Sequence, residues 1–143
     1  MTRALDLEIK NSRNIPRYIF GEGSINNLKS LLLERNDNKS GYAVYFIDIF
    51  FEKNVKPLES LPILDSDQVF YVDTQNEPTT SYVDDLKNRL MGIKKSLPHT
   101  IIGIGGGGAL DVAKAISNLL TNSGNAEDYQ GWDLVKFPGI YKI

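Results

Sequence analysis

Four consecutive glycines are the feature of this sequence with the clearest chemical meaning. They separate a β-branched run, residues 100–104, from an alanine-rich helical stretch that extends from about Ala109 to Leu120. Glycine lets backbone N–H groups approach an anion because it has no Cβ, and the start of a helix adds unsatisfied donors and a partial positive charge. A tight turn would normally need one glycine, so the run favours phosphate or pyrophosphate binding. The four residues are Gly105, Gly106, Gly107 and Gly108.

Two other glycine motifs fit this run less well. Gly103, Gly105 and Gly108 match G-x-G-x-x-G, and Asp128 follows as an acidic residue. The dinucleotide fingerprint belongs to the first strand and helix of its domain, and its acidic residue ends the next strand. Here about four elements come first, and Asp128 lies outside any expected strand. A P-loop is excluded because Lys114 is a turn further into the helix and is not followed by Ser or Thr.

Asp48 and Asp111 are the carboxylates placed to help such a site. Asp48 follows residues 42–47, whose apolar composition is typical of a strand buried on both faces. There it could accept from both hydroxyls of an adenosine ribose and repel a 2′-phosphate, favouring NAD over NADP; the alternative is an aspartate that only shapes the turn. Asp111 is expected in the first turn of its helix, where the macrodipole favours a carboxylate without any ligand. Lys114 could neutralise a phosphate or pair with Asp111.

The sequence offers few metal ligands. It has no cysteine, which excludes disulfides, thiolate catalysis and cysteine-bound metal clusters. Its single histidine, His99, precedes a strand, whereas open α/β sheets bind ligands beyond the carboxyl ends of their strands. A transition-metal site that needs two or three imidazoles cannot be built from this chain alone. We therefore assign it no metal-binding residue and expect His99 at the surface or in a loop.

Composition places the chain among ordinary soluble proteins of one domain. Of its 143 residues, 41% are hydrophobic and 24% are charged. The net charge of −2 gives no basis for binding nucleic acid or for a polybasic membrane anchor. Residues 1–8 lack the apolar run of a signal peptide, and no stretch reaches the length of a membrane span. We expect a cytoplasmic protein, in which the sequon at Asn38 has no role.

The order of apolar patterns predicts an open, mostly parallel, Rossmann-like α/β sheet with helices on both faces. Ser24 is expected to cap the first helix. Residues 124–143 have no assigned element, and Trp132 within them is expected to pack against the protein. Strands are expected at residues 17–20, 42–47, 68–72 and 100–104. A later amphipathic helix has the apolar stripe Val83, Leu86, Leu90 and Ile93.

The glycine run and the helix after it resemble a segment of a known family. Residues 105–115 read G-G-G-G-A-L-D-V-A-K-A, similar to G-G-G-S-x-x-D-x-A-K-A of iron-containing alcohol dehydrogenases. Residues 20–25 resemble the early F-G-x-G-x-[IL] turn of that family, and residues 76–79 resemble its N-P-T or E-P-T loop. Asp48 stands where the family places an aspartate. Position 108 departs from the family, which usually has Ser there.

The resemblance implies that residues 1–143 are the N-terminal dinucleotide-binding domain of such an oxidoreductase, similar to the N-terminal domain of dehydroquinate synthases. It implies NAD as cofactor, with Glu77 and Asp111 joining Asp48 and the glycines as cofactor-binding residues. In the family, a second, helical domain carries an Asp and three His that bind iron or zinc. That domain would begin after residue 143, so this chain alone is expected to hold no metal and to be inactive.

The resemblance also implies a small primary or secondary alcohol as substrate. Residues 111–134 resemble the branch that includes oxidases acting at C8 of 3-deoxy-manno-octulosonate, a lipopolysaccharide sugar. A second copy of the chain is a further expected partner. Two alternatives stay open: a non-catalytic nucleotide-binding or interaction module, and the chemistry of the related dehydroquinate synthases, which residues 111–115 fit less well.

Overall fold

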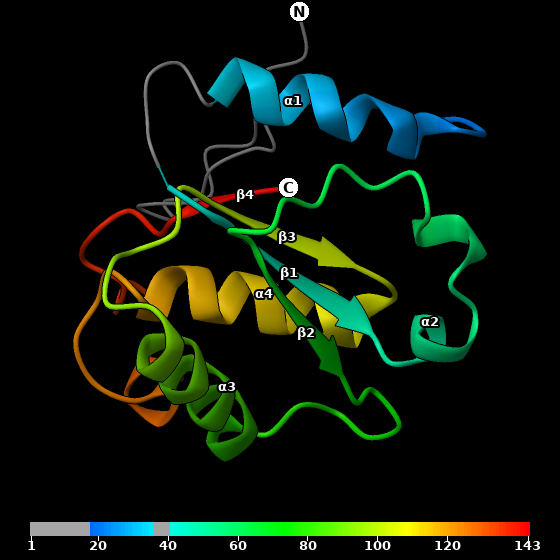
Figure 1. Ribbon diagram of the computed structural model, residues 1–143. Coiled ribbons are helices and arrows are strands. Elements are labelled where there is room, and N and C mark those ends of the chain that lie inside the picture. The colour runs from blue at the N-terminus through cyan, green and yellow to red at the C-terminus, as the bar shows by residue number, and fades with distance from the viewer. Residues whose placement is uncertain (1–17, 36–40) are drawn as a thin grey trace, which may run out of the picture.

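The computed structural model describes residues 18–35 and 41–143, and within them the strands form one parallel sheet in the order β2-β1-β3-β4. The strands are β1 (Ala43–Asp48), β2 (Gln68–Val72), β3 (Thr100–Ile104) and β4 (Tyr141–Lys142). Figure 1 shows α1 (Leu28–Arg35) on one face of the sheet and α3 (Thr80–Ile93) and α4 (Gly107–Leu119) on the other. The predicted α/β fold with helices on both faces is therefore confirmed.

The central strand β1 divides the core into two layers, because successive side chains of a strand point to opposite faces. Val44 and Phe46 face α3 and α4, where the Phe46 and Phe70 rings stack with centroids 5.5 Å apart. Tyr45 and Ile47 face the α1 side. All four β1 side chains are almost completely buried, and each such burial is worth about 1.5–3 kcal/mol.

Gly103 allows α4 to lie directly on β3. A Cβ at this position would be 3.0 Å from the Ala113 Cβ and 3.1 Å from the Leu110 Cδ2. Contacts this short would push the helix away from the strand, since protein interiors have little free volume. The absent side chain therefore helps to fix the direction in which α4 leaves the glycine turn.

The structure differs from the sequence prediction before α1. Residues 18–20 have no regular structure, and the Tyr18 and Phe20 side chains are 85% and 96% exposed. The predicted strand at 17–20 is thus wrong over its described part, because none of the described strands pairs with it. Arg17, residues 1–8 and the sequon at Asn38 lie outside the described residues.

Ser24 does not cap the first helix. The chain enters through Gly23, whose φ of 76° is left-handed, and forms the 3-10 turn η1 (Ser24–Asn27) before α1 begins. The Asn26 N–H donates to the Gly23 carbonyl at 3.0 Å. Backbone bonding within this turn takes the place of the expected side-chain cap.

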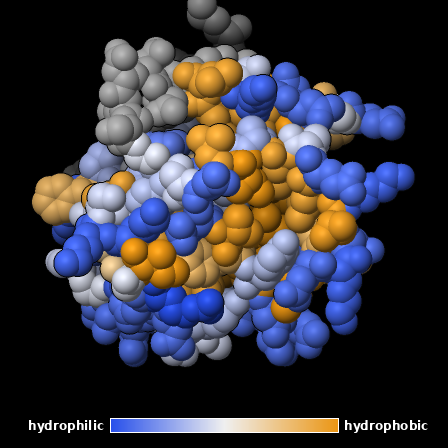
Figure 2. All heavy atoms as spheres, viewed as in Figure 1, coloured by the Kyte–Doolittle hydropathy of each residue, from blue (hydrophilic) through white to orange (hydrophobic). Residues whose placement is uncertain are grey.

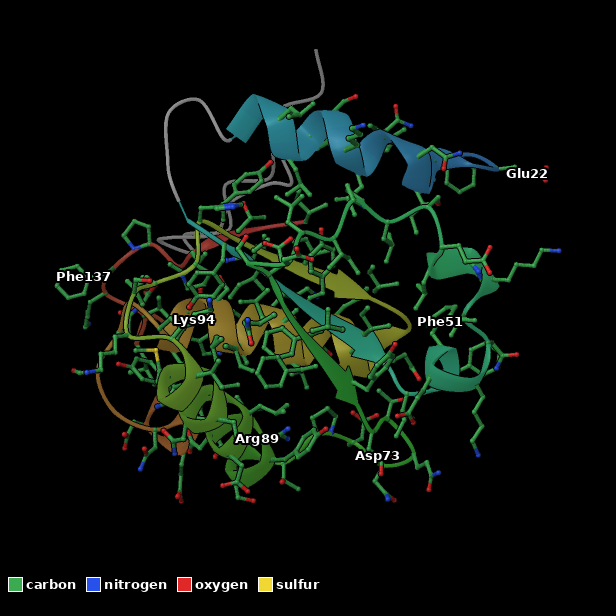
Figure 3. All side chains as sticks on the ribbon, viewed as in Figure 1. Glu22, Phe51, Asp73, Arg89, Lys94 and Phe137 are labelled. Atoms are coloured by element: carbon green, nitrogen blue, oxygen red, sulfur yellow. The ribbon has the colours of Figure 1, made fainter. Side chains whose placement is uncertain are left out.

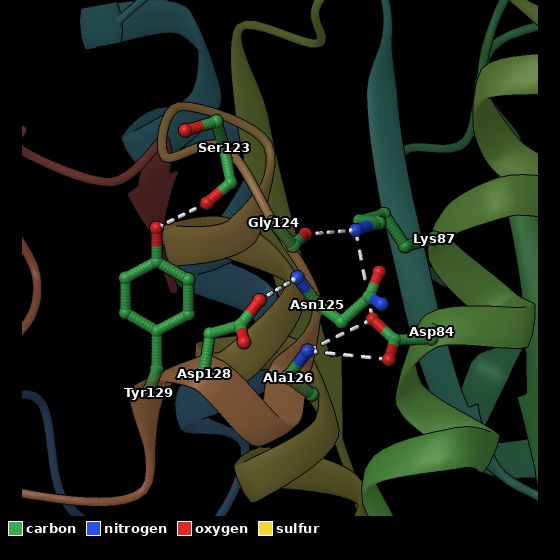
Figure 4. A network of polar contacts seen from close by, with 8 residues as sticks. All are labelled: Asp84, Lys87, Ser123, Gly124, Asn125, Ala126, Asp128 and Tyr129. Carbon is green, nitrogen blue, oxygen red and sulfur yellow. Dashed lines mark hydrogen bonds and ion pairs between the residues drawn. The ribbon is translucent and has the colours of Figure 1, made fainter.

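Residues 124–143 fold against α3 and α4 through polar contacts. The Lys87 ammonium donates to the Gly124 carbonyl at 2.8 Å, and the Ala126 N–H donates to Asp84 (Figure 4). These bonds hold η3 (Ala126–Tyr129) beside α3, and the chain then continues to β4. Trp132 is 81% exposed, so the expected packing role for this side chain is wrong.

The stripe predicted for α3 is mostly confirmed. Val83, Leu86 and Leu90 are buried against α4 and the sheet, whereas Ile93, at the last turn, is 56% exposed. The helix ends at Ile93 and the chain turns away, which leaves that side chain without a surface to cover.

The connection from β1 to β2 contains α2 (Phe50–Lys53) and η2 (Lys56–Leu58). Strand β2 is the edge strand of the sheet on this side. Figure 2 shows apolar side chains gathered in the middle of the face seen there. Exposed apolar residues of the connection and of β2 include Leu64 and Val69. Among the described residues, none of the helices has the length and apolar character needed to cross a membrane.

Candidate functional site

The neighbouring strands β1 and β3 lead into connections on opposite faces of the sheet. After β1, Phe51 and Leu58 pack on the α1 side, whereas β3 leads into α4 on the other side. In open α/β sheets, such a divergence leaves a crevice beyond the carboxyl ends of the two strands, and ligands bind there. Figure 3 shows Asp73 and Phe51 at this same edge of the sheet.

The glycine turn places an open helix start at this edge of the sheet. Helix α4 begins at Gly107, two residues earlier than predicted, and Gly106 precedes it in extended conformation with no side-chain cap. A Cβ at Gly106 or Gly107 would meet no atom within 4 Å. The first N–H groups of a helix have no partner within the helix, so this helix start supplies several backbone donors beside positions that carry no side chain.

Gly105 joins the turn to β1. Its φ of +143° is strained for any residue with a side chain. A Cβ there would be 2.6 Å from the Asp48 Cβ and 3.1 Å from the Ala109 Cβ. Two candidate residues that are far apart in the sequence, Asp48 and Gly105, are thus in direct contact.

Asp48 is the last residue of β1, and each of its carboxylate oxygens accepts a hydrogen bond. The Phe50 N–H donates to Oδ1 at 2.9 Å, and the Thr74 hydroxyl donates to Oδ2 at 2.8 Å. The first bond shows that Asp48 does shape the turn after its strand. Each carboxylate oxygen can accept more than one hydrogen bond, so the half-buried group keeps capacity for a ligand.

Thr74 is the residue at this edge that the sequence analysis missed. It follows β2 by two residues and bonds to Asp48. Its methyl carbon lies 3.3 Å from the place where a Cβ of residue 108 would be, and Pro78 Cδ lies 3.8 Å from the same point. The only signal for Thr74 in the sequence was its place just after a strand, where polar residues of parallel sheets meet.

Among the described residues, no side-chain hydrogen bond or ion pair joins Glu77 or Asp111 to Asp48. Glu77 is exposed in the loop that ends at Thr79, whose hydroxyl caps α3 by accepting from the Tyr82 N–H. Asp111 is the fifth residue of α4, so its expected place in the first turn is wrong because the helix begins earlier. The Asp111 carboxylate lies 3.0 Å from the Lys114 ammonium, so the predicted pair is present. Both side chains are mostly exposed, and such pairs contribute little to the stability of the fold.

His99 lies at the opposite, amino edge, as expected. The backbone N–H of His99 donates to the Tyr42 carbonyl, and its ring Nδ1 is 2.9 Å from the Thr100 hydroxyl.

Burial, with a smaller effect of Asp67, raises the pKa of Tyr45 to about 12, and burial lowers the pKa of Lys142. Neither group is part of the glycine turn.

Within residues 18–35 and 41–143, no group of three or more His, Cys, Asp or Glu side chains is arranged to hold a metal ion. The described residues therefore do not fit the iron or zinc site that the sequence resemblance implies for the whole protein. An open groove of about 550 Å³ runs along α3 beside Tyr82 and Arg89. It contains none of the predicted site residues.

Comparison with known proteins agrees with the fold and the order of these elements. A model of the family described as iron-containing alcohol dehydrogenase matches residues 16–141, and this chain belongs to that family. A sulfoacetaldehyde reductase of Bilophila wadsworthia is 37% identical over 86 residues, which are 59% of this chain and 21% of that protein. The chain thus spans only a minor part of this relative.

Among solved structures, the fold is similar to that of a sulfoacetaldehyde reductase from Bifidobacterium kashiwanohense, crystallised in complex with NAD+. The TM-score is 0.61 with 20% sequence identity, over 78% of this chain and 28% of that chain. At this level of identity the likeness concerns the fold. It agrees with the Rossmann-like architecture inferred from the sheet.

Proposed function

We propose that the carboxyl edge of β1 and β3 binds NAD, and that the whole protein is an NAD-dependent oxidoreductase acting on an alcohol and its aldehyde or ketone. The observation that carries this proposal is the contact between Asp48 and the glycine turn, at the point where α4 begins without a side-chain cap. The Asp48 carboxylate, which suits ribose hydroxyls, therefore lies beside the N–H donors of the glycine turn, which suit a pyrophosphate.

Each part of the site has a separate task in this proposal. The N–H groups of Gly106, Gly107 and Gly108 bind the pyrophosphate, and the missing side chains at the first two positions leave room for it. Asp48 accepts from the ribose hydroxyls. Glu77 and Asp111 border the bound cofactor. NAD, when bound, accepts or supplies a hydride, while the protein provides position and electrostatics.

We assign the catalytic metal to residues outside this chain, because the described residues do not form a group that could hold it. On this basis residues 1–143 bind cofactor but do not turn over substrate alone.

Two substrate classes are supported, one by the sequence resemblance and the other by the names of the relatives. Residues 111–134 resemble the branch that includes 3-deoxy-manno-octulosonate 8-oxidases, which favours a sugar acid with a primary alcohol. The relatives found by comparison carry the name sulfoacetaldehyde reductase, which favours a short aldehyde with an anionic group. Both classes combine a small carbonyl–alcohol pair with a negative charge, so both belong in the first assays of the full-length protein.

The ribose contact is tested by Asp48→Ala in the full-length protein. Loss of the carboxylate removes acceptors for the ribose hydroxyls and also removes repulsion of a 2′-phosphate. We expect the ratio of kcat/KM for NAD to that for NADP to fall by about tenfold or more, in keeping with hydrogen bonds to a charged group. Steady-state kinetics with each cofactor gives the ratio.

Asp65→Ala is the matched control, because Asp65 is an exposed carboxylate before β2, at the other edge of the sheet. It should leave the cofactor ratio unchanged. An Asp48→Ala protein that is folded and keeps the parent ratio would show that Asp48 is only a turn residue.

A further inference from the structure

Thr74 contacts two parts of the candidate site with the two branches of one side chain. Its hydroxyl donates to Asp48 Oδ2 at 2.8 Å. Its methyl carbon lies 3.3 Å from the position that a Cβ of residue 108 would take, in the first turn of α4. The side chain therefore lies between the carboxylate at the end of β1 and the start of the helix.

Both contacts depend on a single rotamer. The hydroxyl and the methyl are attached to the same Cβ, and β-branched side chains have few accessible χ1 values. A rotation to another staggered position would take the hydroxyl away from Asp48. The methyl packing beside Gly108 thus favours the rotamer in which the hydroxyl holds the carboxylate.

The Asp48 carboxylate is held at both of its oxygens as a result. Oδ1 accepts from the Phe50 N–H, Oδ2 accepts from Thr74, and the Asp48 Cβ lies against the backbone of Gly105. The backbone bond and the glycine contact are set by the turns themselves. The Thr74 hydroxyl is the side-chain donor that sets the rotation of the carboxylate.

We propose that Thr74 is a positioning residue, which orients Asp48 toward the ribose and so sets the preference for NAD over NADP. This inference rests on the proposed function, because it needs Asp48 to contact the ribose. Thr74 acts through Asp48, and it needs no contact of its own with the cofactor.

The glycine at position 108 is consistent with this role. The family usually has Ser there, and residue 108 lies within α4, where the backbone would accept Ser. Its Cβ, however, would require the Thr74 methyl to move by a few tenths of an ångström. Gly108 leaves the space that Thr74 uses, so the two positions form one packing arrangement.

Two substitutions in the full-length protein separate the hydroxyl from the methyl. Thr74→Val keeps the branched shape and removes the donor, whereas Thr74→Ser keeps the donor and removes the methyl. We expect Thr74→Val to lower the NAD-to-NADP ratio of kcat/KM by about three- to tenfold, the effect of one net hydrogen bond. The change should fall more on the KM for NAD than on kcat. Thr74→Ser should stay within about twofold of the parent, on the scale of that same bond.

The same measurements in the Asp48→Ala background complete a double-mutant cycle. If Thr74 acts through Asp48, Thr74→Val should not change the ratio further once the carboxylate is absent. Circular dichroism and thermal unfolding confirm that each variant is folded.

Three outcomes would overturn the proposal. An unchanged ratio in Thr74→Val, with a lowered ratio in Asp48→Ala, would leave the ribose contact standing and remove Thr74 from it. An equal decrease in Thr74→Val and Thr74→Ser would show a packing role of the methyl. An unchanged ratio in Asp48→Ala would remove the ribose contact itself, and the role of Thr74 with it.

Discussion

Single residues of the glycine run have different tasks, although the sequence shows them as equivalent. Gly105 has the positive φ and the close contact with Asp48, so its glycine is required by the fold. Gly106 has a φ of −80° and open space around its Cβ position. The structure therefore assigns the backbone strain to Gly105 and leaves Gly106 free for a ligand.

Gly106→Val is expected to fold and to lose NAD binding. A Cβ at Gly106 would meet no atom within 4 Å, but the valine side chain would project into the space in which we place the pyrophosphate. Isothermal titration of the full-length variant with NAD, together with circular dichroism, measures both properties.

Gly92→Val is the matched control for this substitution. Gly92 lies in α3, and a Cβ there also meets no atom within 4 Å. The control protein should bind NAD as the parent does. A folded Gly106→Val protein with the affinity of the parent would instead favour a simple turn.

At the scale of elements, one buried amide organises the segment that leads to β4. The Asn122 side chain donates to the Asn118 and Phe137 carbonyls, both at 2.9 Å. It accepts from the N–H groups of Lys136 and Phe137. These bonds join the end of α4 to a loop more than ten residues away, and β4 follows from that loop.

Asn122→Ala should lower the free energy of unfolding by about 2–4 kcal/mol, because several buried backbone groups lose their partners. Urea unfolding measures the change. Asn88→Ala, at an exposed position of α3, is the control and should stay within about 0.5 kcal/mol of the parent. Equal stability of the two variants would mean that water replaces the Asn122 amide at no cost.

At the scale of the molecule, the chain is much shorter than the relatives that it matches. It spans 21% of one curated relative and 28% of one solved structure. In our proposal, the metal and the substrate-binding groups of the whole enzyme lie outside this chain.

The purified 143-residue chain is expected to contain no stoichiometric iron or zinc, whereas the full-length protein should bind one. The chain has no cysteine and one histidine, which cannot supply a set of soft ligands. Elemental analysis after purification without chelators tests the difference. One tightly bound equivalent in the short chain would refute this division.

The sequence by itself determined most elements of this protein. The apolar runs near residues 42–47, 68–72 and 100–104 are strands, and the periodic segments after them are helices, because burial leaves a local period in the sequence. The glycine run also identified the phosphate-binding turn as a candidate. The same local reasoning failed at residues 17–20, where an apolar run was left without a neighbour to pair with.

Only the tertiary structure decided how these parts meet. The strand order, the contact of Asp48 with Gly105, and the place of Thr74 depend on segments that are distant in the sequence. Residues 124–143 are held by apolar contacts of Ala126, Tyr129 and Ile140 with the core and by hydrogen bonds such as that of Lys87 to Gly124. A polar contact between distant segments satisfies donors and acceptors without producing any period along the chain, so it becomes visible only when the fold brings its partners together.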